Sequence, residues 1–462
     1  MDQSHDNSIY SLVVSWALSI PMLFFVARGT FSFDHSSTNN ELAINSGTLS
    51  GAWNIGAAYF QAQQLLVYIL VCIIMTSLLA RCIRRLTLKS SAMLMSLPVL
   101  AVASVLWSQN AAKSAIAATT IVLLTCFSVY LTERFTPIRQ IQFFYLMGIV
   151  TLLVSLMLVF LYPAAGIANF GDKGAWQGLF VHKNHCAIVM TYLVAPALCM
   201  KSRSQLGRIG KTIYLASATA LIFMTRSRTG WMLVAATMLF VVVAYALGRL
   251  RAREKALFLI LAFCAIAVAA IFAVTYFAQL SVLLGKSATM SGRTDIWKAI
   301  LPALSDRPVL GYGFRAFWLG MQGPSSTIAL TTGYIGPANA ENSVLQVWLE
   351  LGAVGVCLML AILFVSVKNA LKCMIAAPSS YVTWCSVNVF LTILALSDGD
   401  KIMYPNTVEW ILYVMSYVAL AEEAKKLRQG TDKSSVPNSQ MVKAKETTHN
   451  DYTFGYGCHT NP

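Results

Sequence analysis

Long apolar runs separated by short polar breaks recur along almost the whole chain. A helix needs about 20 mostly apolar residues to cross a bilayer, whereas a membrane β-barrel is built from shorter segments of alternating polarity. The pattern therefore predicts an all-α polytopic membrane protein with about twelve transmembrane helices. The predicted spans lie near residues 9–27, 64–80, 91–107, 115–132, 143–162, 185–200, 212–225, 230–247, 256–277, 345–366, 381–397 and 407–420. The seventh and eighth could also form a re-entrant feature, because only residues 226–229 separate them.

A long loop, 278–344, interrupts this pattern between the ninth and tenth spans. Within it, "SGRTDIWKAILPALSDRP" has the spacing of an amphipathic helix, capped by Ser291 or Thr294 and ended at Pro308. The glycines of "GYG" at 311–313 then predict a tight turn. The predicted apolar face of the helix consists of Ile296, Trp297, Ile300, Leu301 and Leu304.

The segments between and beyond the runs divide the chain into four parts. A first membrane bundle covers 1–277 and includes an outer loop at 163–184. The long loop follows at 278–344, and a second bundle covers 345–420. The remaining residues, 421–462, lose the apolar pattern and become rich in Ser, Thr, Asn and Lys, so we expect a disordered tail.

Charge changes the picture in two ways. Only 11% of the residues are charged, against about 25% in a soluble domain. The net charge of +15 comes from Lys and Arg that gather in alternate loops, 16 in one set of short loops and 7 in the other. Basic residues collect in cytoplasmic loops, so both termini are predicted to be cytoplasmic, the long loop faces outward, and no nucleic-acid partner is expected.

Metal and cofactor chemistry receives no support from the sequence. The ten cysteines lie mostly in or beside apolar runs and form no CxxC pair, so we interpret them as small buried hydrophobes. The "DGD" at 398–400 could suggest a metal site, but two acids around a glycine are common in solvated turns. No metal and no cofactor are expected.

Several cations are predicted to face outward at the membrane boundary. Arg226 and Arg228 stand in "FMTRSRTGWMLV", Arg293 begins the loop helix, and His182 and Lys183 precede the sixth span. Arginine presents a planar fork of donors that matches phosphate oxygens, so these residues could bind an anion such as a diphosphate. Each also has a structural interpretation: a snorkelling boundary arginine, a solvated helix start, or an interfacial anchor.

A carboxylate, Glu341, is predicted on the same outer side, directly before Asn342 and the tenth span. A carboxylate near bound cations could act as a general base. It could equally be a surface acid in front of the helix caps Asn342 and Ser343.

Four motifs, in order, resemble the membrane-embedded O-antigen ligase and polymerase family (WaaL/Wzy-like proteins). They are "TRSRTGW", "GRTDIWKAIL", "PVLGYGF" and "ENSVLQVWLELGAVG". The segment "GLFVHKN" is similar to the ExoQ-type branch, which polymerises exopolysaccharide repeat units. Together the motifs cover roughly 176–355.

The resemblance implies a metal-independent, inverting glycosyltransferase in the bacterial inner membrane. Its donor would be a glycan on a polyprenyl diphosphate, and its acceptor a sugar hydroxyl at the periplasmic face. Arg228 or Arg226, together with Arg293, would hold the diphosphate, with Lys183, His182 and Asn342 as further substrate contacts. Many members have His-Asn where this chain has Glu341-Asn342, which favours Glu341 as the base and a polymerase over a ligase; Asp398 is a more distant candidate base.

Three other functions stay open. A ligase that moves the finished glycan to lipid A-core or protein shares the donor chemistry. A transporter would carry its polar residues near the membrane midplane and would show two matching halves, and neither is evident in the sequence. A structural scaffold is the third. Besides donor, acceptor and lipid bilayer, a chain-length regulator is a further candidate partner.

Overall fold

The computed structural model of the chain is helical throughout the part that it describes. Its regular elements are all helices, joined by loops that contain two isolated β-bridges, Ile167 with Trp176 and Leu319 with Gln322. The predicted all-α fold is confirmed for these residues. The described residues are 89–168, 173–180, 182–202, 204–251, 254, 293–320, 322–332, 339–396, 403–404 and 407–434.

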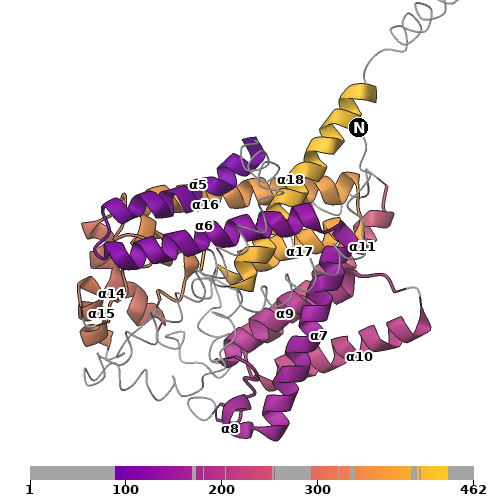
Figure 1. Cartoon of the computed structure of the whole chain (residues 1–462), viewed down its shortest axis with the longest axis horizontal. Coiled ribbons are helices and arrows are strands. Elements are labelled where there is room, and N and C mark those ends of the chain that lie inside the picture. The colour runs from indigo at the N-terminus through magenta and orange to yellow at the C-terminus, as the bar shows by residue number, and fades with distance from the viewer. Residues whose placement is uncertain are drawn as a thin grey trace, which may run out of the picture.

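In the described part of the chain, nine helices pack into a bundle (Figure 1). They are α5 (Lys89–Ala103), α6 (Ala111–Arg134), α7 (Pro137–Leu161), α9 (Lys183–Cys199), α10 (Gln205–Met224), α11 (Arg228–Arg249), α16 (Ser343–Ala376), α17 (Ser380–Ala395) and α18 (Val408–Ser434). Four short elements complete the described part: η3 (Ser104–Leu106), α8 (Pro163–Gly166), α14 (Arg293–Asp306) and α15 (Pro324–Thr332). The helices α14 and α15 lie together at one end of the bundle, at the left of Figure 1.

The centre of the bundle is formed by α9, α17 and α18. Nearly every residue of α9 is buried, because α7, α10, α11 and α17 surround it. Large side chains such as Trp384 and Trp410 are fully buried between α17, α18 and their neighbours. A helix that is apolar all round requires such a buried position.

The outer helices turn apolar side chains away from the protein. Met157 on α7, Leu239 on α11 and Phe364 on α16 are all more than half exposed. In the described part of the chain, α6, α7, α11 and α16 are long and apolar enough to cross a membrane. Exposed apolar faces on such helices support a membrane protein, in which lipid covers them.

The predicted spans correspond to described helices from the third to the eighth and from the tenth to the twelfth. The predicted spans at 9–27, 64–80 and 256–277 lie outside the described residues, so the count of twelve stays a prediction. The seventh and eighth are separate helices of 20 and 22 residues that contact each other. The basic residue that ends α6 is Arg134 and the one that ends α11 is Arg249.

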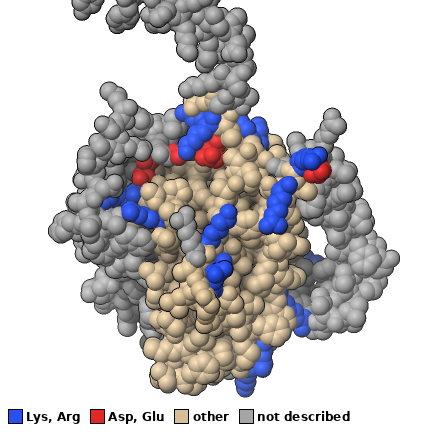
Figure 2. All heavy atoms as spheres, turned by 90° about the vertical axis from the view of Figure 1, so that its right-hand side faces the viewer, with Lys and Arg blue, Asp and Glu red and all other residues tan. Residues whose placement is uncertain are grey.

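Lys and Arg side chains are spread over the side of the molecule that lies at the right of Figure 1, opposite α14 and α15 (Figure 2). A basic face of this kind is typical of the cytoplasmic end of a membrane protein. The predicted orientation, with both termini cytoplasmic, stays a prediction.

The tail prediction needs a correction. The segment 421–462 was expected to be disordered, but α18 continues through Ser434. Residues 421–430, "AEEAKKLRQG", are rich in strong helix formers. Glu423 pairs with Lys426 at 3.4 Å, and Lys372 Nζ of α16 donates to Ala424 O at 3.3 Å. Residues 435–462 lie outside the described part.

The described part of the predicted loop helix is α14, Arg293–Asp306, which ends at Asp306 as expected, whereas the predicted cap Ser291 lies outside the described residues. Its buried face contains Ile296, Ile300 and Leu304, which pack with α15 and the start of α16. One predicted face residue is wrong: Leu301 is 56% exposed, and Ala303 is buried in its place. Residues 296, 300, 303 and 304 form one stripe along α14 that packs into a shared buried cluster, and Leu301 lies beyond the edge of that stripe.

Helix α16 is broken at Gly352, which has φ 67° and ψ −168°. This backbone conformation is accessible essentially only to glycine. The break is filled by the loop after α14: Ala353 N donates to Pro308 O at 2.8 Å, and Val354 N donates to Val309 O at 3.3 Å. The loop residues 308–313 and the break at Gly352 form the structure that we call the joint.

The joint also satisfies the carbonyl groups in front of the break. Tyr312 N donates to Leu349 O at 2.8 Å, and Gly313 N donates to Glu350 O at 2.9 Å. A broken helix in a membrane protein is tolerated only where its backbone groups find such partners. Burial and the nearby Asp306 raise the pKa of Tyr312, which keeps its hydroxyl protonated as the donor to Ala303 O at 3.1 Å.

Candidate active site at the start of helix α16

The first group of candidate residues joins α14 to the start of α16. Arg293 Nη2 lies 3.2 Å from Glu341 Oε2, so the predicted cation and the predicted base form an ion pair. The side chains are 25% and 38% exposed, which leaves both within reach of a ligand. These two residues are 48 positions apart along the chain. The packing of α14 against α16 brings them together.

The backbone around Glu341 is held from two sides. Ala340 N donates to Gln346 Oε1 at 2.9 Å, and Trp297 Nε1 donates to Ala340 O at 3.0 Å. Glu341 N donates to Asn339 Oδ1 at 2.7 Å. Ala340 itself is fully buried, so both of its backbone polar groups depend on these side chains.

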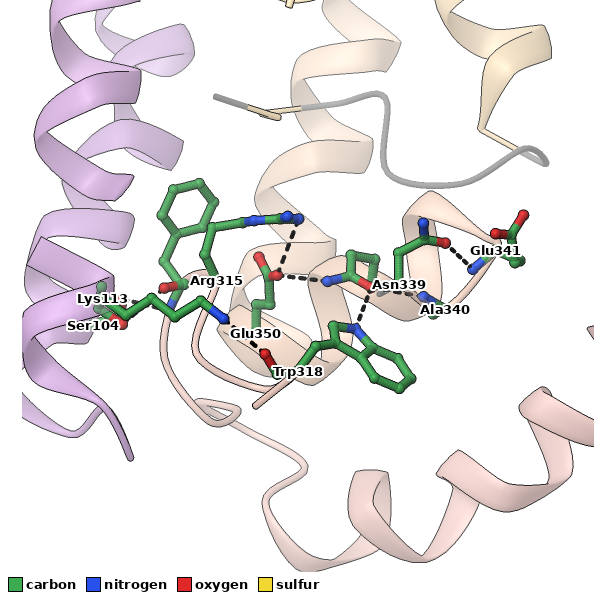
Figure 3. A network of polar contacts seen from close by, with 11 residues as sticks. Ser104, Lys113, Arg315, Trp318, Asn339, Ala340, Glu341 and Glu350 are labelled. Atoms are coloured by element: carbon green, nitrogen blue, oxygen red, sulfur yellow. Dashed lines mark hydrogen bonds and ion pairs between the residues drawn. The ribbon is translucent and has the colours of Figure 1, made fainter. Parts of the chain in front are cut away.

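A second carboxylate, Glu350, lies within α16, and its side chain is only 4% exposed (Figure 3). Its Oε1 atom lies 3.7 Å from Arg315 Nη1 and accepts a hydrogen bond from Gln346 Nε2 at 2.5 Å. Trp318 Nε1 donates to Gln346 Oε1 at 3.0 Å, and Lys113 Nζ donates to Trp318 O at 2.7 Å. We call these five residues the Glu350 network; Lys113 lies at one end of the polar contacts in Figure 3 and Glu341 at the other.

A buried carboxylate needs a cation and hydrogen-bond donors to offset the loss of its hydration. Arg315 supplies the charge for Glu350, and its guanidinium also stacks over the ring of Tyr404, 4.2 Å from the ring centroid. These residues come from the loop after the joint and from the segment before α18. Together with Lys113 near the start of α6, Arg315 and Tyr404 connect three parts of the chain to the buried end of α16.

Backbone strain is concentrated at these groups. The positive-φ residues other than glycine, among those described, are Arg226, Arg315, Glu341 and Met403. Three are charged candidate or network residues, and Met403 directly precedes Tyr404. Such a conformation costs roughly 1–3 kcal/mol per residue and is often found at functional sites.

The second group of candidates lies where α9 and α11 begin. Arg226 Nη1 donates to Lys173 O at 3.2 Å, and Lys183 Nζ donates to Arg226 O at 3.5 Å. His182 precedes α9 and caps it, since its Nδ1 accepts from Asn184 N at 3.2 Å. We call Lys173, Lys183, Arg226 and Arg228 the rim cluster.

Arg226 and Arg228 flank the turn between α10 and α11, and both are exposed. Ser227 between them is buried and is the N-cap of α11, because its Oγ accepts from Gly230 N at 3.2 Å. Arg228 is the first residue of α11. The positive end of a helix dipole and the four cations together favour an anion here.

Asn342 has a structural task that the sequence also allowed. Its Oδ1 accepts from Val344 N at 2.9 Å and from Leu345 N at 3.1 Å, which makes it the N-cap of α16. Its assignment as a substrate contact stays a prediction. Asp398, the more distant candidate base, lies outside the described residues.

The family comparison covers both groups of arginines. Residues 213–375 match the family described as O-Antigen ligase. The family resemblance is confirmed over this segment. It contains Arg226, Arg228, Arg293, Glu341 and the Glu350 residue of the network, whereas His182 and Lys183 lie before it. No curated protein matches the chain.

The sequence analysis missed the Glu350 network. One signal was available: Gln346 and Glu350 fall inside the predicted tenth span, and an ionisable residue within a span is costly enough to suggest a function. Lys113 and Arg315 gave no comparable signal, because a single cation near a span end or after a turn is common. Only the fold places them beside α16.

Proposed function

We propose that this O-antigen ligase family protein is a polysaccharide repeat-unit polymerase. It would transfer a glycan from a polyprenyl diphosphate carrier to an acceptor sugar hydroxyl at the periplasmic face of the bacterial inner membrane. The family match supports glycan transfer from a lipid carrier. The observation that carries the proposal is the ion pair of Arg293 and Glu341 inside the matched segment. It places a partly exposed carboxylate beside a guanidinium group, which is well suited to bind phosphate.

Glu341 is proposed as the general base. The acceptor hydroxyl gives its proton to the Glu341 carboxylate as its oxygen forms a bond to the anomeric carbon. The bond between that carbon and the diphosphate oxygen breaks, and its electron pair leaves with the diphosphate. A single displacement of this kind inverts the anomeric configuration, and a positioned base contributes about 10²- to 10⁴-fold to such a step.

Arg293 is proposed to stabilise the leaving diphosphate. Its guanidinium has five donors and contacts Glu341 through one nitrogen at 3.2 Å. A guanidinium group matches phosphate oxygens, on which negative charge grows during the reaction. In a single displacement the hydroxyl attacks and the diphosphate leaves on opposite faces of the anomeric carbon, so Glu341 and Arg293 would act on opposite sides of that carbon.

The rim cluster is proposed to grip the lipid-linked diphosphate before reaction. Three of its cations, Lys183, Arg226 and Arg228, lie at the starts of α9 and α11, where exposed apolar side chains such as Phe223 and Met232 are available to contact a polyprenyl chain. This would explain why two arginines stand between two apolar helices. Arg228 or Arg226, with Lys183, His182 and Asn342, would complete the donor contacts.

A ligase is the second candidate, and the match to the O-antigen ligase family favours it. Donor chemistry would be the same, and the acceptor would be lipid A-core or a protein. Replacement of the family's frequent His by Glu341 supports the polymerase. A transporter would require Arg228 near the midplane, so labelling of Arg228→Cys from the periplasmic side supports the enzyme, and protection of this cysteine supports transport.

The test uses a deletion strain complemented with wild type, Arg293→Ala or Glu341→Gln. Lys298 is exposed on α14, the helix that carries Arg293, so Lys298→Ala is the matched control. Lipid-linked sugars and polymer are extracted and sized, and protein levels are compared. We expect single repeat units on the carrier and no long polymer in both site variants, with normal polymer in Lys298→Ala.

Each other pattern has a defined meaning. Long chains that accumulate on the carrier in Arg293→Ala identify a ligase. Normal polymer in Glu341→Gln removes Glu341 from the role of base, and normal polymer in both variants rejects the proposed site. If Glu341→His keeps activity, an imidazole can replace the carboxylate as base.

A further inference from the structure

The position of Glu341 depends on residues that do not face the reacting atoms. Glu341 has φ 50° and follows the fully buried Ala340. The Ala340 peptide groups are gripped by Gln346 Oε1 on one side and by Trp297 Nε1 on the other. Without these two bonds, the segment would lose the contacts that hold a strained backbone in place.

Chemistry allows only one orientation of the Gln346 amide. Ala340 N–H and Trp318 Nε1–H are donors, so both must face the amide oxygen. Glu350 is paired with Arg315 and is an acceptor when ionised, so it must face the amide nitrogen. Each hydrogen bond in the network therefore fixes the direction of the next.

Trp297 adds a link to the catalytic pair. It lies one helical turn after Arg293 on α14. The same helix thus holds Glu341 by its side chain through Arg293 and holds the preceding peptide through Trp297. Any shift of α14 moves both contacts together.

We propose that Gln346 and Trp297 form a clamp on the Ala340 peptide, with Gln346 oriented by Glu350, and that the clamp positions Glu341 for proton transfer. The three are positioning residues rather than catalytic residues. This inference rests on the proposed function of Glu341. Misplacement of a catalytic group by about 1 Å can lower the rate about 100-fold, so the clamp should affect kcat, while KM for the donor depends on the rim cluster.

The first test removes one hydrogen-bond donor from the clamp. Trp297→Phe keeps an aromatic ring but loses the bond to Ala340 O. Trp410→Phe is the matched control, because Trp410 Nε1 donates to Thr125 Oγ1 at 3.0 Å in the core of the bundle, away from Ala340 and the joint. Purified variants are assayed with lipid-linked saccharide extracted from the deletion strain, and their melting temperatures are compared.

For Trp297→Phe we expect kcat to fall about 10- to 100-fold with KM within twofold of wild type. Trp410→Phe should keep at least half of the wild-type kcat. Wild-type kcat in Trp297→Phe overturns the clamp, and so does an equal loss in both variants, which would indicate a general effect of losing an indole.

The second test exchanges the two side chains of the α16 pair. Gln346→Glu places a second carboxylate beside Glu350 and should lower kcat at least tenfold. Adding Glu350→Gln should restore much of it, because the new glutamate accepts from Ala340 and Trp318 while the new glutamine donates to it and accepts from Arg315. A stable double variant that is no more active than Gln346→Glu overturns the proposal.

Glu341→Gln in the same assay separates the two proposals. If it is fully active, the proposed role of Glu341 fails whatever the clamp variants do. If it is inactive while Trp297→Phe and the exchange variants behave as wild type, the base assignment stands and the clamp alone is rejected.

Discussion

Replacing Gly352 by alanine tests whether the joint holds the two halves of α16 and the site in place. A β-carbon at this position would overlap the Val309 carbonyl and the Leu310 nitrogen of the facing loop. The neighbouring atoms are backbone, so no side chain can rotate away. The φ of 67° adds strain that only glycine avoids.

The cost can be estimated from two contributions. The disfavoured backbone conformation costs roughly 1–3 kcal/mol. Relief of the overlap requires the loop to move, and the four backbone hydrogen bonds across the joint contribute about 1 kcal/mol each when they are lost. A loss of about 3 kcal/mol or more is expected, which corresponds to a fall in melting temperature of roughly 5 °C or more.

Gly210→Ala is the matched control. Gly210 lies within α10, and a β-carbon there meets no atom within 4 Å. Alanine in an open helical position stabilises by about 0.5–1 kcal/mol. Unfolding of both purified proteins in detergent is followed by tryptophan fluorescence, and polymer is sized in cells.

We expect a lower melting temperature and loss of polymer for Gly352→Ala, with neither change in Gly210→Ala. A Gly352→Ala protein that melts within one degree of wild type would refute the reasoning about the joint. Normal stability together with lost polymer would also contradict it, because the predicted activity loss follows from displaced structure.

Two further predictions concern the turn at α11 and the end of α18. Ser227→Ala removes the N-cap between Arg226 and Arg228, so it should lower the free energy of unfolding by about 1 kcal/mol and raise the donor KM. Ser204→Ala, which removes the equivalent cap of α10, is the control. An equal change of KM in both variants would exclude a specific effect at the rim cluster. A chain that stops after Ser434 should keep wild-type stability and polymer. A chain that stops after Ala421 loses the buried Ala424 and with it the carbonyl that accepts from Lys372, so it should melt at a lower temperature. Equal melting temperatures of the two truncations would contradict the packing role of α18.

Local pattern predicted the helices well where one helix face or one cap decides the structure. The loop helix ends where its Asp306–Pro308 segment indicated, and Asn342 caps α16 as its position suggested. The sequence could not reveal the break at Gly352. Residues 345–366 form a continuous apolar run, and a glycine inside it becomes a break only because residues 308–313 dock there.

The candidate site was predictable in its parts and not in its connections. Arg293 and Glu341 were recognisable as residue types at an outer boundary, and their pairing required α14 to pack on α16. Lys113 is separated from Trp318 by 205 residues, so no local signal could join them. Glu350 lies within an apolar run, where an ionisable side chain is costly unless it has partners. Its position alone therefore predicts partners such as Arg315 and Gln346, as it does for the rim arginines.

The motif order along the chain has a structural explanation. "GRTDIWKAIL" and "PVLGYGF" both contact "ENSVLQVWLELGAVG" directly: Arg293 pairs with Glu341, and the 308–313 loop bonds to the backbone on both sides of the break at Gly352. They fold as one unit around Glu341. "TRSRTGW" instead contacts the 163–184 loop, since Arg226 Nη1 donates to Lys173 O and Trp176 N donates to Met224 O.

This division matches the two requirements of the proposed reaction. A long lipid-linked anion must be held at the membrane surface, and exposed cations on helix starts suit that purpose because they need not be placed to a fraction of an ångström. Proton transfer from the acceptor requires a base within hydrogen-bond distance, and such a base needs a rigid frame. The rim cluster has the exposure of the former, and the clamp, the joint and the buried Glu350 network provide the rigidity of the latter.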